Sequence, residues 1–390
     1  MQVVCNNGLC GNGGQRTALT LGAPAPGKPR KLFMFPRSDL GPTPRIAALA
    51  TAVPSYDLPQ AEVAARAAAM FSTTPGGFAR LAPIYANAEI EHRHACAPID
   101  WFTEPHSFGE RNDLFLKNAV DLLTEAAERA LEQAGLDPTD IDAIVTICST
   151  GIATPGLEAR VMERLPFRRD VERTPVFGLG CAGGVLGLAR AAAMAQAKPQ
   201  SRVLLLVVEL CALTFRNQDR SKSNLVATAL FGDGAAAAIV SCREEYADAP
   251  RLGPWGEHTW PDSLDVMGWE VADDGLKVVF SRDIPTLVRE DLRPVIDAFL
   301  EKNGAALNDV AGFVCHPGGA KVIDALEDCF GLQRGDLVHA RRVLREHGNM
   351  SAATVLFVLR ETLDAKARGP QLMTTLGPGF TAGMMVVEAA

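Results

Sequence analysis

This sequence of 390 residues has no closely spaced cysteines of the kind that bind metals or form a disulfide framework. It also has no long apolar run. Its nine cysteines are scattered, with no Cys-x-x-Cys pair and no spacing typical of a zinc site. This pattern argues against a disulfide framework and indicates a reducing compartment, which we take to be the cytoplasm. No window of about 18 residues is continuously apolar, and the N-terminus lacks the pattern of a signal peptide. We therefore expect a soluble, unexported protein with no transmembrane segment.

An excess of positive charge is missing as well. The net charge is -8 and the isoelectric point is about 5.5, which argues against a general nucleic-acid binder. An anionic ligand must therefore find a local basic patch. Residues 1–43 are rich in Gly, Pro and Asn, and we predict that they form a flexible N-terminal extension.

From Arg45 onward the sequence alternates between apolar strands and helical patterns. The strands are continuously apolar, which is typical of a sheet covered on both faces. This alternation predicts a layered α/β architecture. We expect strands at 45–54, 140–150, 173–180 and 202–210 and helices at 61–71, 110–135 and 183–197.

The chain also repeats itself. "LEQAGLDPTDIDAIVTICSTG", which starts at Leu131, aligns without a gap with "LEKNGAALNDVAGFVCHPGG", which starts at Leu300. "GLGCAGGVLGLAR" aligns in the same way with "GNMSAATVLFVLR", and "LFGDGAAAAIV" resembles "LGPGFTAGMMVV". We predict two similar halves, residues 44–245 and 246–390, that share an interface. Residues at which the halves differ are then the candidates for chemistry.

The first such difference is Cys181, because the aligned residue of the second half is Ser351. Cys181 stands where a strand gives way to a helix, and a helix N-terminus favours the thiolate. Gly183 and Gly184 after it would let a substrate or a neighbouring backbone come close. The alternative is a small apolar cysteine in a tight contact between helix and sheet.

Two further differences lie in the second half. His316 follows an apolar strand and precedes a Pro-Gly-Gly turn, whereas the aligned residue is Ile147. The carboxyl end of a strand is where open α/β sheets bind ligands. Asn349 precedes a helix and is aligned with Leu179. The alternative for His316 is a structural histidine in the core or in a turn. The alternative for Asn349 is a helix N-cap with no catalytic role. If the halves face each other, Cys181, His316 and Asn349 converge, and such a set suits acyl transfer.

These segments, "GLGCAGG", "CHPGG", "GNMSAATVLF", "LFGDGAAAAIV" and "LGPGF", resemble those of type III polyketide synthases, the chalcone-synthase-like members of the thiolase superfamily. The resemblance runs in order over about residues 45–388. It implies a duplicated thiolase fold of five αβαβα layers with mostly buried mixed sheets. It also implies a homodimeric acyltransferase that uses acyl-CoA and malonyl-CoA as substrates and needs no further cofactor and no metal.

The same resemblance assigns roles to the three residues. Cys181 is expected to be the nucleophile that carries the starter and the growing chain. His316 and Asn349 are expected to decarboxylate malonyl-CoA and to stabilise the enolate, which requires hydrogen-bond donors more than a base. We also expect His316 to hold Cys181 as a thiolate, since an ion pair lowers the pKa of a thiol.

The resemblance extends, more weakly, to the gate and the cavity. Phe231 corresponds to a gatekeeper phenylalanine, whereas Val278 stands at the second gatekeeper position, with Phe280 two residues further on. Loss of a ring would widen the passage and favour a long flexible acyl chain. Cavity positions fall on Ser149, Glu209, Cys211, Thr214 and Ser351, together with a bulkier Trp269.

By the same resemblance, plant members bind the CoA phosphates with several basic residues, and of these positions Arg80 alone is basic in this sequence. Lys321 is a second candidate for binding the CoA phosphates. Solvated surface charges are the alternative for both. We expect iterative condensation of a fatty acyl starter with malonyl-CoA, ending in an alkylpyrone or alkylresorcinol. The starter donor is CoA or, as an alternative, a fatty-acid synthase or acyl carrier protein. The alternative is a ketoacyl-ACP synthase III-like enzyme that catalyses a single condensation. The presence of Cys181, His316 and Asn349 argues against a non-catalytic thioester-binding scaffold.

Overall fold

Nine strands make up the main sheet, and their order is repeated from one half of the chain to the other. The structure is a computed structural model that describes residues 41–71, 82–281 and 283–389. Read across the sheet, the strands are β11 (Gly312–Cys315), β12 (Gly369–Gly377), β13 (Thr381–Ala389), β8 (Arg251–Thr259), β1 (Arg45–Ala52), β7 (Asp233–Ser241), β6 (Arg202–Leu210), β4 (Ala143–Cys148) and β5 (Glu172–Phe177).

The two halves of this sheet also share strand directions. β4 and β6 are parallel, as are β11 and β12, whereas β7 and β13 are antiparallel to both of their neighbours. β1 and β8 are the strands at which the two half-sheets meet. They are joined through the single register pair Arg45 and Arg251. Among the described strands of the main sheet, β5 is the one strand without a counterpart in the other half. The predicted duplication is therefore confirmed.

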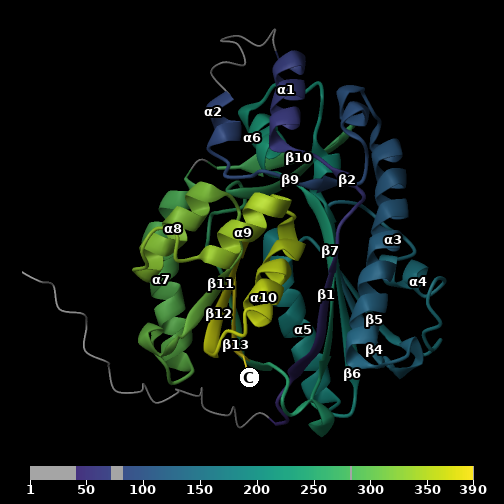
Figure 1. The fold of residues 1–390 in the computed structure, drawn as a ribbon, viewed down its shortest axis with the longest axis vertical. Helices are drawn as coiled ribbons and strands as arrows, with labels where there is room; N and C mark the ends of the chain where they lie inside the picture. The colour runs from purple at the N-terminus through teal and green to yellow at the C-terminus, as the bar shows by residue number, and fades with distance from the viewer. Residues whose placement is uncertain (1–40, 72–81, 282, 390) are drawn as a thin grey trace, which may run out of the picture. The chain divides into compact units, whose positions relative to one another are not determined.

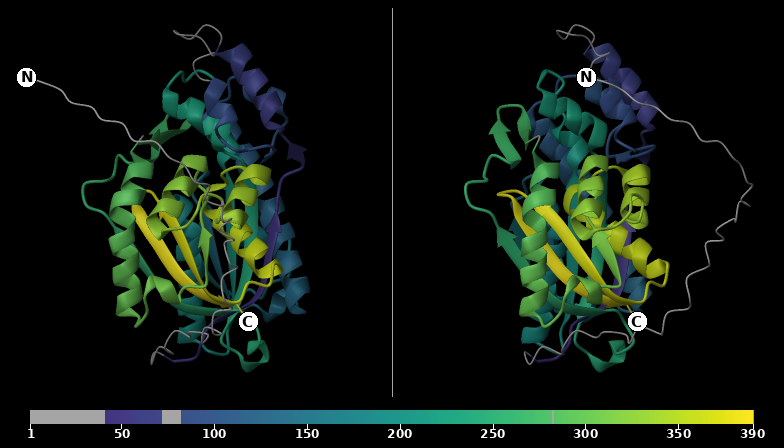
Figure 2. Two further views of the ribbon diagram at one scale, coloured as in Figure 1. Left: turned by 60° about the vertical axis from the view of Figure 1, so that its left-hand side comes forward. Right: turned by 90° about the vertical axis from the view of Figure 1, so that its left-hand side faces the viewer.

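Helices form three layers around and between the half-sheets. α3 (Phe108–Ala134) packs on β1, β6 and β7. α5 (Gly183–Ala197) and α10 (Thr354–Asp364) contact each other and strands of both halves. α7 (Ile284–Lys302) and α8 (Ala320–Phe330) cover the strands of the second half (Figures 1 and 2). The order is helix, sheet, paired helices, sheet, helix, as the five-layered αβαβα prediction requires.

Local signals explain why these elements form where they do. Ser107 caps the N-terminus of α3, and Glu110 completes the capping box. Gly135 ends the helix with φ at 65°, a conformation that glycine adopts easily. β4, β6 and β7 are buried almost along their full length, because helices cover both faces of the first half-sheet. The strands predicted from apolar runs are thus confirmed.

A group of smaller elements gathers at one end of the main sheet, at the top of Figure 1. The apolar side chains of its three helices form a cluster of their own. The group consists of α1 (Gln60–Met70), α2 (Ala82–Ala86), α6 (Lys222–Leu230) and the hairpin of β9 (Met267–Ala272) and β10 (Gly275–Phe280). The remaining elements are β2 (Tyr56–Asp57), β3 (His94–Ala95), α4 (Leu157–Val161) and α9 (Val338–His347).

Within the described ranges the seven cysteines are free thiols, and no helix is long and apolar enough to cross a membrane. Residues 1–40 of the predicted extension lie outside the described residues. The predicted boundary between the halves, at residues 245 and 246, falls inside a short 3-10 helix, Glu244–Tyr246, ahead of β8. The division into domains stays a prediction.

Candidate active site

Cys181 lies in a tight turn between β5 and α5. The 3-10 helix η4 (Gly180–Ala182) makes this turn, and Gly180 has φ at 47°, where a side chain would be strained. Gly184 follows in α5, and a Cβ there would stand 2.3 Å from the carbonyl oxygen of Ala352. A glycine is needed at this position because the neighbouring backbone comes close, which is one of the two options the sequence left open.

The close approach brings the two halves into contact at their aligned positions. The Sγ of Cys181 lies 3.5 Å from the Oγ of Ser351, within hydrogen-bond reach of a thiol. Ser351 begins the 3-10 helix η8 (Ser351–Ala353), which precedes α10 as η4 precedes α5. The thiol therefore sits at the junction of the two copies, as the repeat predicted.

His316 lies directly beyond β11, at the carboxyl end of the strand. Its backbone N–H donates to the carbonyl of Thr374 at 2.9 Å and continues the ladder between β11 and β12. The side chain is buried, and its Nδ1 has no hydrogen-bond partner among the described residues. The ring is thus placed by the strand end and by packing, and no carboxylate of the described chain orients it.

Asn349 performs two tasks. Its Oδ1 accepts a hydrogen bond at 2.8 Å from the backbone N–H of Ser351, so it caps the turn. Its Nδ2 donates to the carbonyl of Gly318 at 3.1 Å, in the turn that follows His316. An amide nitrogen has two hydrogens, so one remains for a ligand. The capping role considered as the alternative and the functional placement are both present.

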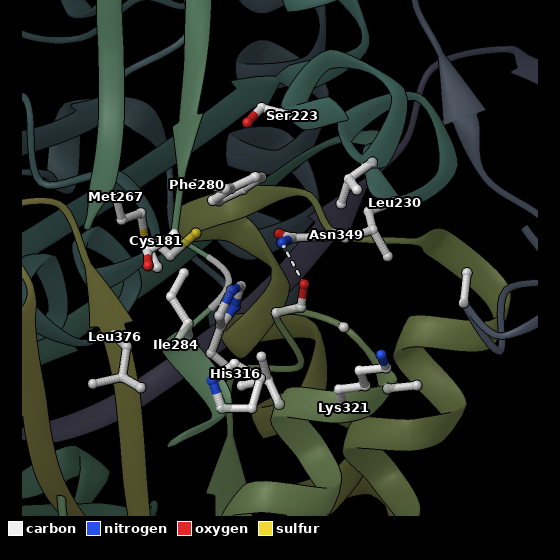
Figure 3. Close-up of a pocket in the computed structure, with 18 of the residues that line it drawn as sticks. Cys181, Ser223, Leu230, Met267, Phe280, Ile284, His316, Lys321, Asn349 and Leu376 are labelled. Carbon is white, nitrogen blue, oxygen red and sulfur yellow. Dashed lines mark hydrogen bonds between the residues drawn. The ribbon is translucent and has the colours of Figure 1, made fainter. Parts of the chain in front are cut away.

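Cys181, His316 and Asn349 line the same cavity of about 520 Å³ (Figure 3). The sequence prediction that the three converge agrees with this geometry. Most of the other walls are apolar side chains from α2, α6, α7, α8, β12 and the β9–β10 hairpin. They include Ile84, Val226, Leu230, Met267, Phe280, Ile284, Pro285, Val322, Leu326 and Leu376.

Burial shifts the pKa values of Cys181 and His316 in opposite directions. It raises the pKa of Cys181 to about 12, and the nearby charge of Glu209 adds to this, whereas the Ser351 hydrogen bond acts in the opposite direction. Burial lowers the pKa of His316 to about 4. Both shifts favour the uncharged forms, a thiol and a neutral imidazole, and the thiolate–imidazolium pair stays a prediction.

Glu209 is a buried carboxyl near this site. Its two oxygens accept from the hydroxyls of Ser149 at 2.7 Å and Thr150 at 2.8 Å, and from the Ser149 N–H at 3.0 Å. Burial raises its pKa to about 7, against these hydrogen bonds, which favour the charged form. Ser149 is therefore committed to Glu209 and is not among the residues that line the cavity, contrary to the placement expected from the sequence.

Both halves of the chain match known protein domains. Residues 99–243 match the N-terminal domain of chalcone and stilbene synthases, and residues 257–389 match the C-terminal domain. The chain belongs to the chalcone and stilbene synthase family. As a type III polyketide synthase it is a decarboxylating, condensing acyltransferase, as the resemblance implied.

Relatives of this polyketide synthase cover most of its length. A Bacillus subtilis protein that bears the name of a chalcone synthase is 39% identical, over 87% of this chain and 97% of its own. The 1,3,6,8-tetrahydroxynaphthalene synthase of Streptomyces peucetius is 36% identical, over 88% and 92%. The solved 1,3,6,8-tetrahydroxynaphthalene synthase of Streptomyces coelicolor superposes with a TM-score of 0.84 at 26% identity, covering 88% and 99%.

Phe231, the predicted gatekeeper of this synthase, belongs to an aromatic cluster. The ring of Phe231 packs edge-on against Trp269 at 6.0 Å and Phe280 at 5.7 Å between centroids. Val278 is buried behind them against Cys211, and it does not line the cavity, whereas Phe280 does. Phe280, at the end of β10, lines the cavity, whereas Val278 and Trp269 do not, and the widened passage stays a prediction.

A second, apolar slot of about 60 Å³ is lined by Phe231, which is not among the residues that line the cavity of Cys181. Cys211 lines it together with Phe231 and apolar residues of α1 and its surroundings. Thr214 does not line it, because its hydroxyl donates to the carbonyl of Cys211 at 2.7 Å and the residue is buried. Of the predicted small cavity residues, Cys211 alone lines one of these two spaces, and Ser351 contacts Cys181 instead.

The cavity edge carries two exposed lysines. Lys321, predicted from the sequence, lies at the start of α8, and Lys222 lies at the start of α6. Neither forms an ion pair with a described carboxylate. Arg80, the other predicted CoA contact, lies outside the described residues. Lys222 was not predicted, although "RSKSN" has a lysine directly after Ser221, which caps α6.

Proposed function

We propose that this enzyme loads a fatty acyl chain from CoA onto Cys181 and extends it about two or three times with malonyl-CoA. The product is an alkylpyrone or an alkylresorcinol, released after ring closure, and no cofactor beyond the CoA thioesters takes part. The observation that carries the proposal is the cavity itself, in which three polar catalytic side chains face walls that are otherwise mostly apolar. Apolar walls stabilise a bound alkyl chain by about 0.8 kcal/mol per buried CH₂.

The first step is acyl transfer. The Cys181 sulfur forms a thioester with the acyl carbon, the bond from that carbon to the CoA sulfur breaks, and the thiol proton passes to His316 and then to the leaving CoA thiolate. The 3.5 Å contact to Ser351 orients the sulfur. Lys222 and Lys321, which line the cavity, supply the positive charge that attracts the CoA phosphates.

The second step is decarboxylative condensation. Malonyl-CoA loses CO₂, and the electron pair of the broken bond forms an enolate, whose carbon attacks the Cys181 thioester and expels the thiolate. His316 and the free N–H of Asn349 donate hydrogen bonds to the enolate oxygen. Burial supports this role, since it keeps His316 neutral with one ring N–H available as a donor.

The exposed edge of β5 supports a homodimer. β5 is the outermost strand of the sheet, and Phe177 at its end is 59% exposed while Ile152 in the loop after β4 is 49% exposed. An open strand edge flanked by apolar side chains is a favourable site for a second copy. A monomer in solution at micromolar concentration would contradict this part of the proposal.

The deciding experiment offers acyl-CoAs of graded chain length together with malonyl-CoA and identifies the products by mass. We expect kcat/KM to rise with chain length until the apolar space is filled. Highest activity with acetyl-CoA and a decline with every added CH₂ would contradict the fatty starter. The same series on an acyl carrier protein distinguishes the two starter donors.

A second candidate is a polyhydroxylated aromatic product made from malonyl-CoA alone. Relatives in Streptomyces are named 1,3,6,8-tetrahydroxynaphthalene synthase and 3,5-dihydroxyphenylacetyl-CoA synthase. The apolar slot also favours it, because about 60 Å³ holds little more than two water molecules and an alkyl tail there requires side chains to move. An incubation with malonyl-CoA alone tests it, and a hydroxylated aromatic product without any alkyl chain would replace the first proposal.

A further inference from the structure

Arg93 is a buried cation whose partners are backbone carbonyls. The side chain is 2% exposed. One guanidinium nitrogen donates to Thr228 at 2.7 Å and to Phe231 at 3.0 Å, and the other donates to Ala229 at 3.0 Å. These carbonyls belong to the last turn of α6 and the residue after it, where a helix is partly negative. The cation therefore secures the C-terminal end of α6.

The segment that Arg93 holds contains the gate and is bonded to Asn349. Asn349 donates its backbone N–H to Leu230 at 2.8 Å and accepts from the N–H of Gly232 at 3.1 Å. These two hydrogen bonds flank Phe231, which forms an isolated bridge with Asn349. A shift of this segment must therefore move the Phe231 ring and the Asn349 amide together.

Close packing leaves little freedom for such a shift. A Cβ on Gly232 would stand 2.3 Å from the carbonyl oxygen of His347 and 3.3 Å from the Cβ of Arg93. A Cβ on Gly348 would stand 2.8 Å from the carbonyl oxygen of Leu230 and 3.6 Å from the Cβ of Arg93. The Cβ of Arg93 thus packs against both glycines beside the bridge, while its guanidinium holds the helix end.

We propose that Arg93 is a positioning residue that sets the gate ring Phe231 and the catalytic amide of Asn349 as one unit. It acts through these two residues and does not touch the substrate. The inference rests on the proposed function, in which Asn349 serves malonyl-CoA decarboxylation and is not needed for acylation of Cys181. A loss of position should therefore harm one half-reaction more than the other.

The test compares the two half-reactions in Arg93→Lys. Lysine keeps the charge but lacks the planar fork that serves three carbonyls. We expect malonyl-CoA decarboxylation to fall about 10- to 100-fold, since a misplacement of about 1 Å can cost about 10²-fold. Formation of the Cys181 adduct from a short acyl-CoA should fall less than about threefold. Equal losses in both half-reactions, or no loss in either, would overturn the proposal.

Arg111→Lys is the matched control. Arg111 is 5% exposed and donates to the carbonyls of Leu213 at 3.1 Å and His106 at 3.3 Å, but it is not bonded to the segment at 228–232. Its substitution should lower the melting temperature without changing the ratio of the half-reactions. The same change of ratio in Arg111→Lys would reduce Arg93 to a merely structural residue.

Two further variants test whether Arg93 acts through this segment and through Asn349. If Arg93→Lys does not fold, Gly232→Ala disturbs the same segment and must show the same unequal loss. The double variant Arg93→Lys with Asn349→Ala must decarboxylate no more slowly than Asn349→Ala alone, and additive losses would contradict action through Asn349. A wild-type enzyme that does not decarboxylate malonyl-CoA would instead refute the proposed function, and this inference with it.

Discussion

The turn at Cys181 and the turn at Ser351 are built alike but divide the chemistry between them. Each consists of a 3-10 helix, η4 or η8, that leads into one of the two central helices. The first presents the thiol to the cavity, whereas the second turns Ser351 toward the thiol and presents Asn349, two residues earlier, to the cavity. A duplicated scaffold thus places two turns against each other, and single substitutions separate the proposed nucleophile, Cys181, from the proposed oxyanion donors, His316 and Asn349.

Moving the thiol from one turn to the other should disturb this division of labour most severely. We expect Cys181→Ala to abolish both the acyl-enzyme adduct and the product. Adding Ser351→Cys to it should not restore them, because Ser351 is buried and does not line the cavity. Intact-protein mass after incubation with acyl-CoA measures the adduct. An acyl group on the introduced thiol of the double variant would show that the two turns are interchangeable.

Removal of a donor from the second half should have the next largest effect. His316→Ala and Asn349→Ala should each slow malonyl-CoA decarboxylation by about 10²- to 10³-fold, the usual cost of one oxyanion donor. Release of CO₂ from labelled malonyl-CoA measures this rate. Because Asn349 takes no part in acylation, the Asn349→Ala enzyme should still form the Cys181 adduct. Near-normal decarboxylation in both variants would remove the second half from the mechanism.

Filling the slot behind the gate tests whether the first half also selects the starter. Cys211→Phe should spare short acyl-CoAs and reject those of roughly ten carbons or more, because overpacking blocks the apolar slot that Cys211 lines. The ratio of kcat/KM for a long and a short acyl-CoA measures the selection. Thr214→Phe is the control, since Thr214 is buried but does not line the slot, and it should lower the melting temperature and the activity for all starters alike. Equal losses with Cys211→Phe would sink the fatty-starter proposal.

The smallest effect concerns a buried carboxyl that the first half has and the second lacks. Glu209 is the eighth residue of β6, and the eighth residue of β12 is Leu376. Its pKa is raised by burial from 4.5 to about 7, so the folded state binds the proton more tightly than the unfolded state. The resulting stability is full below about pH 4 and is lost as the pH rises through 7, by up to about 3 kcal/mol.

Glu209→Gln should therefore flatten the dependence of the melting temperature on pH between about 5 and 8. Asp233, whose pKa burial also raises to about 7, keeps part of the slope in the variant. Melting curves of both proteins across this range provide the measurement. A melting temperature that rises with pH in the wild type would show that the Ser149 and Thr150 hydrogen bonds outweigh burial.

The repeat and the three residues that meet in the cavity could be predicted because their signals are local. The offset between Leu131 and Leu300 aligns the halves without a gap, and a polar residue at a strand end or helix start, where the other half has Ile147 or Leu179, stands out. The gate could be predicted only in part. The sequence identifies Phe231, but the packing of Trp269 and Phe280 against it depends on a hairpin distant in the chain.

The order of elements, the duplication and the three residues that meet at the junction follow from the amino-acid order, because periodicity and repeats depend on neighbours along the chain. Which side chains line the two cavities follows only from packing in three dimensions. Val278 and Phe280 lie two residues apart in one strand, yet one is buried behind the gate and the other lines the cavity. Burial likewise makes a neutral Cys181 and a neutral His316 the favoured forms. Desolvation depends on atoms that surround a group in space, most of them from distant parts of the chain, and no local pattern records them.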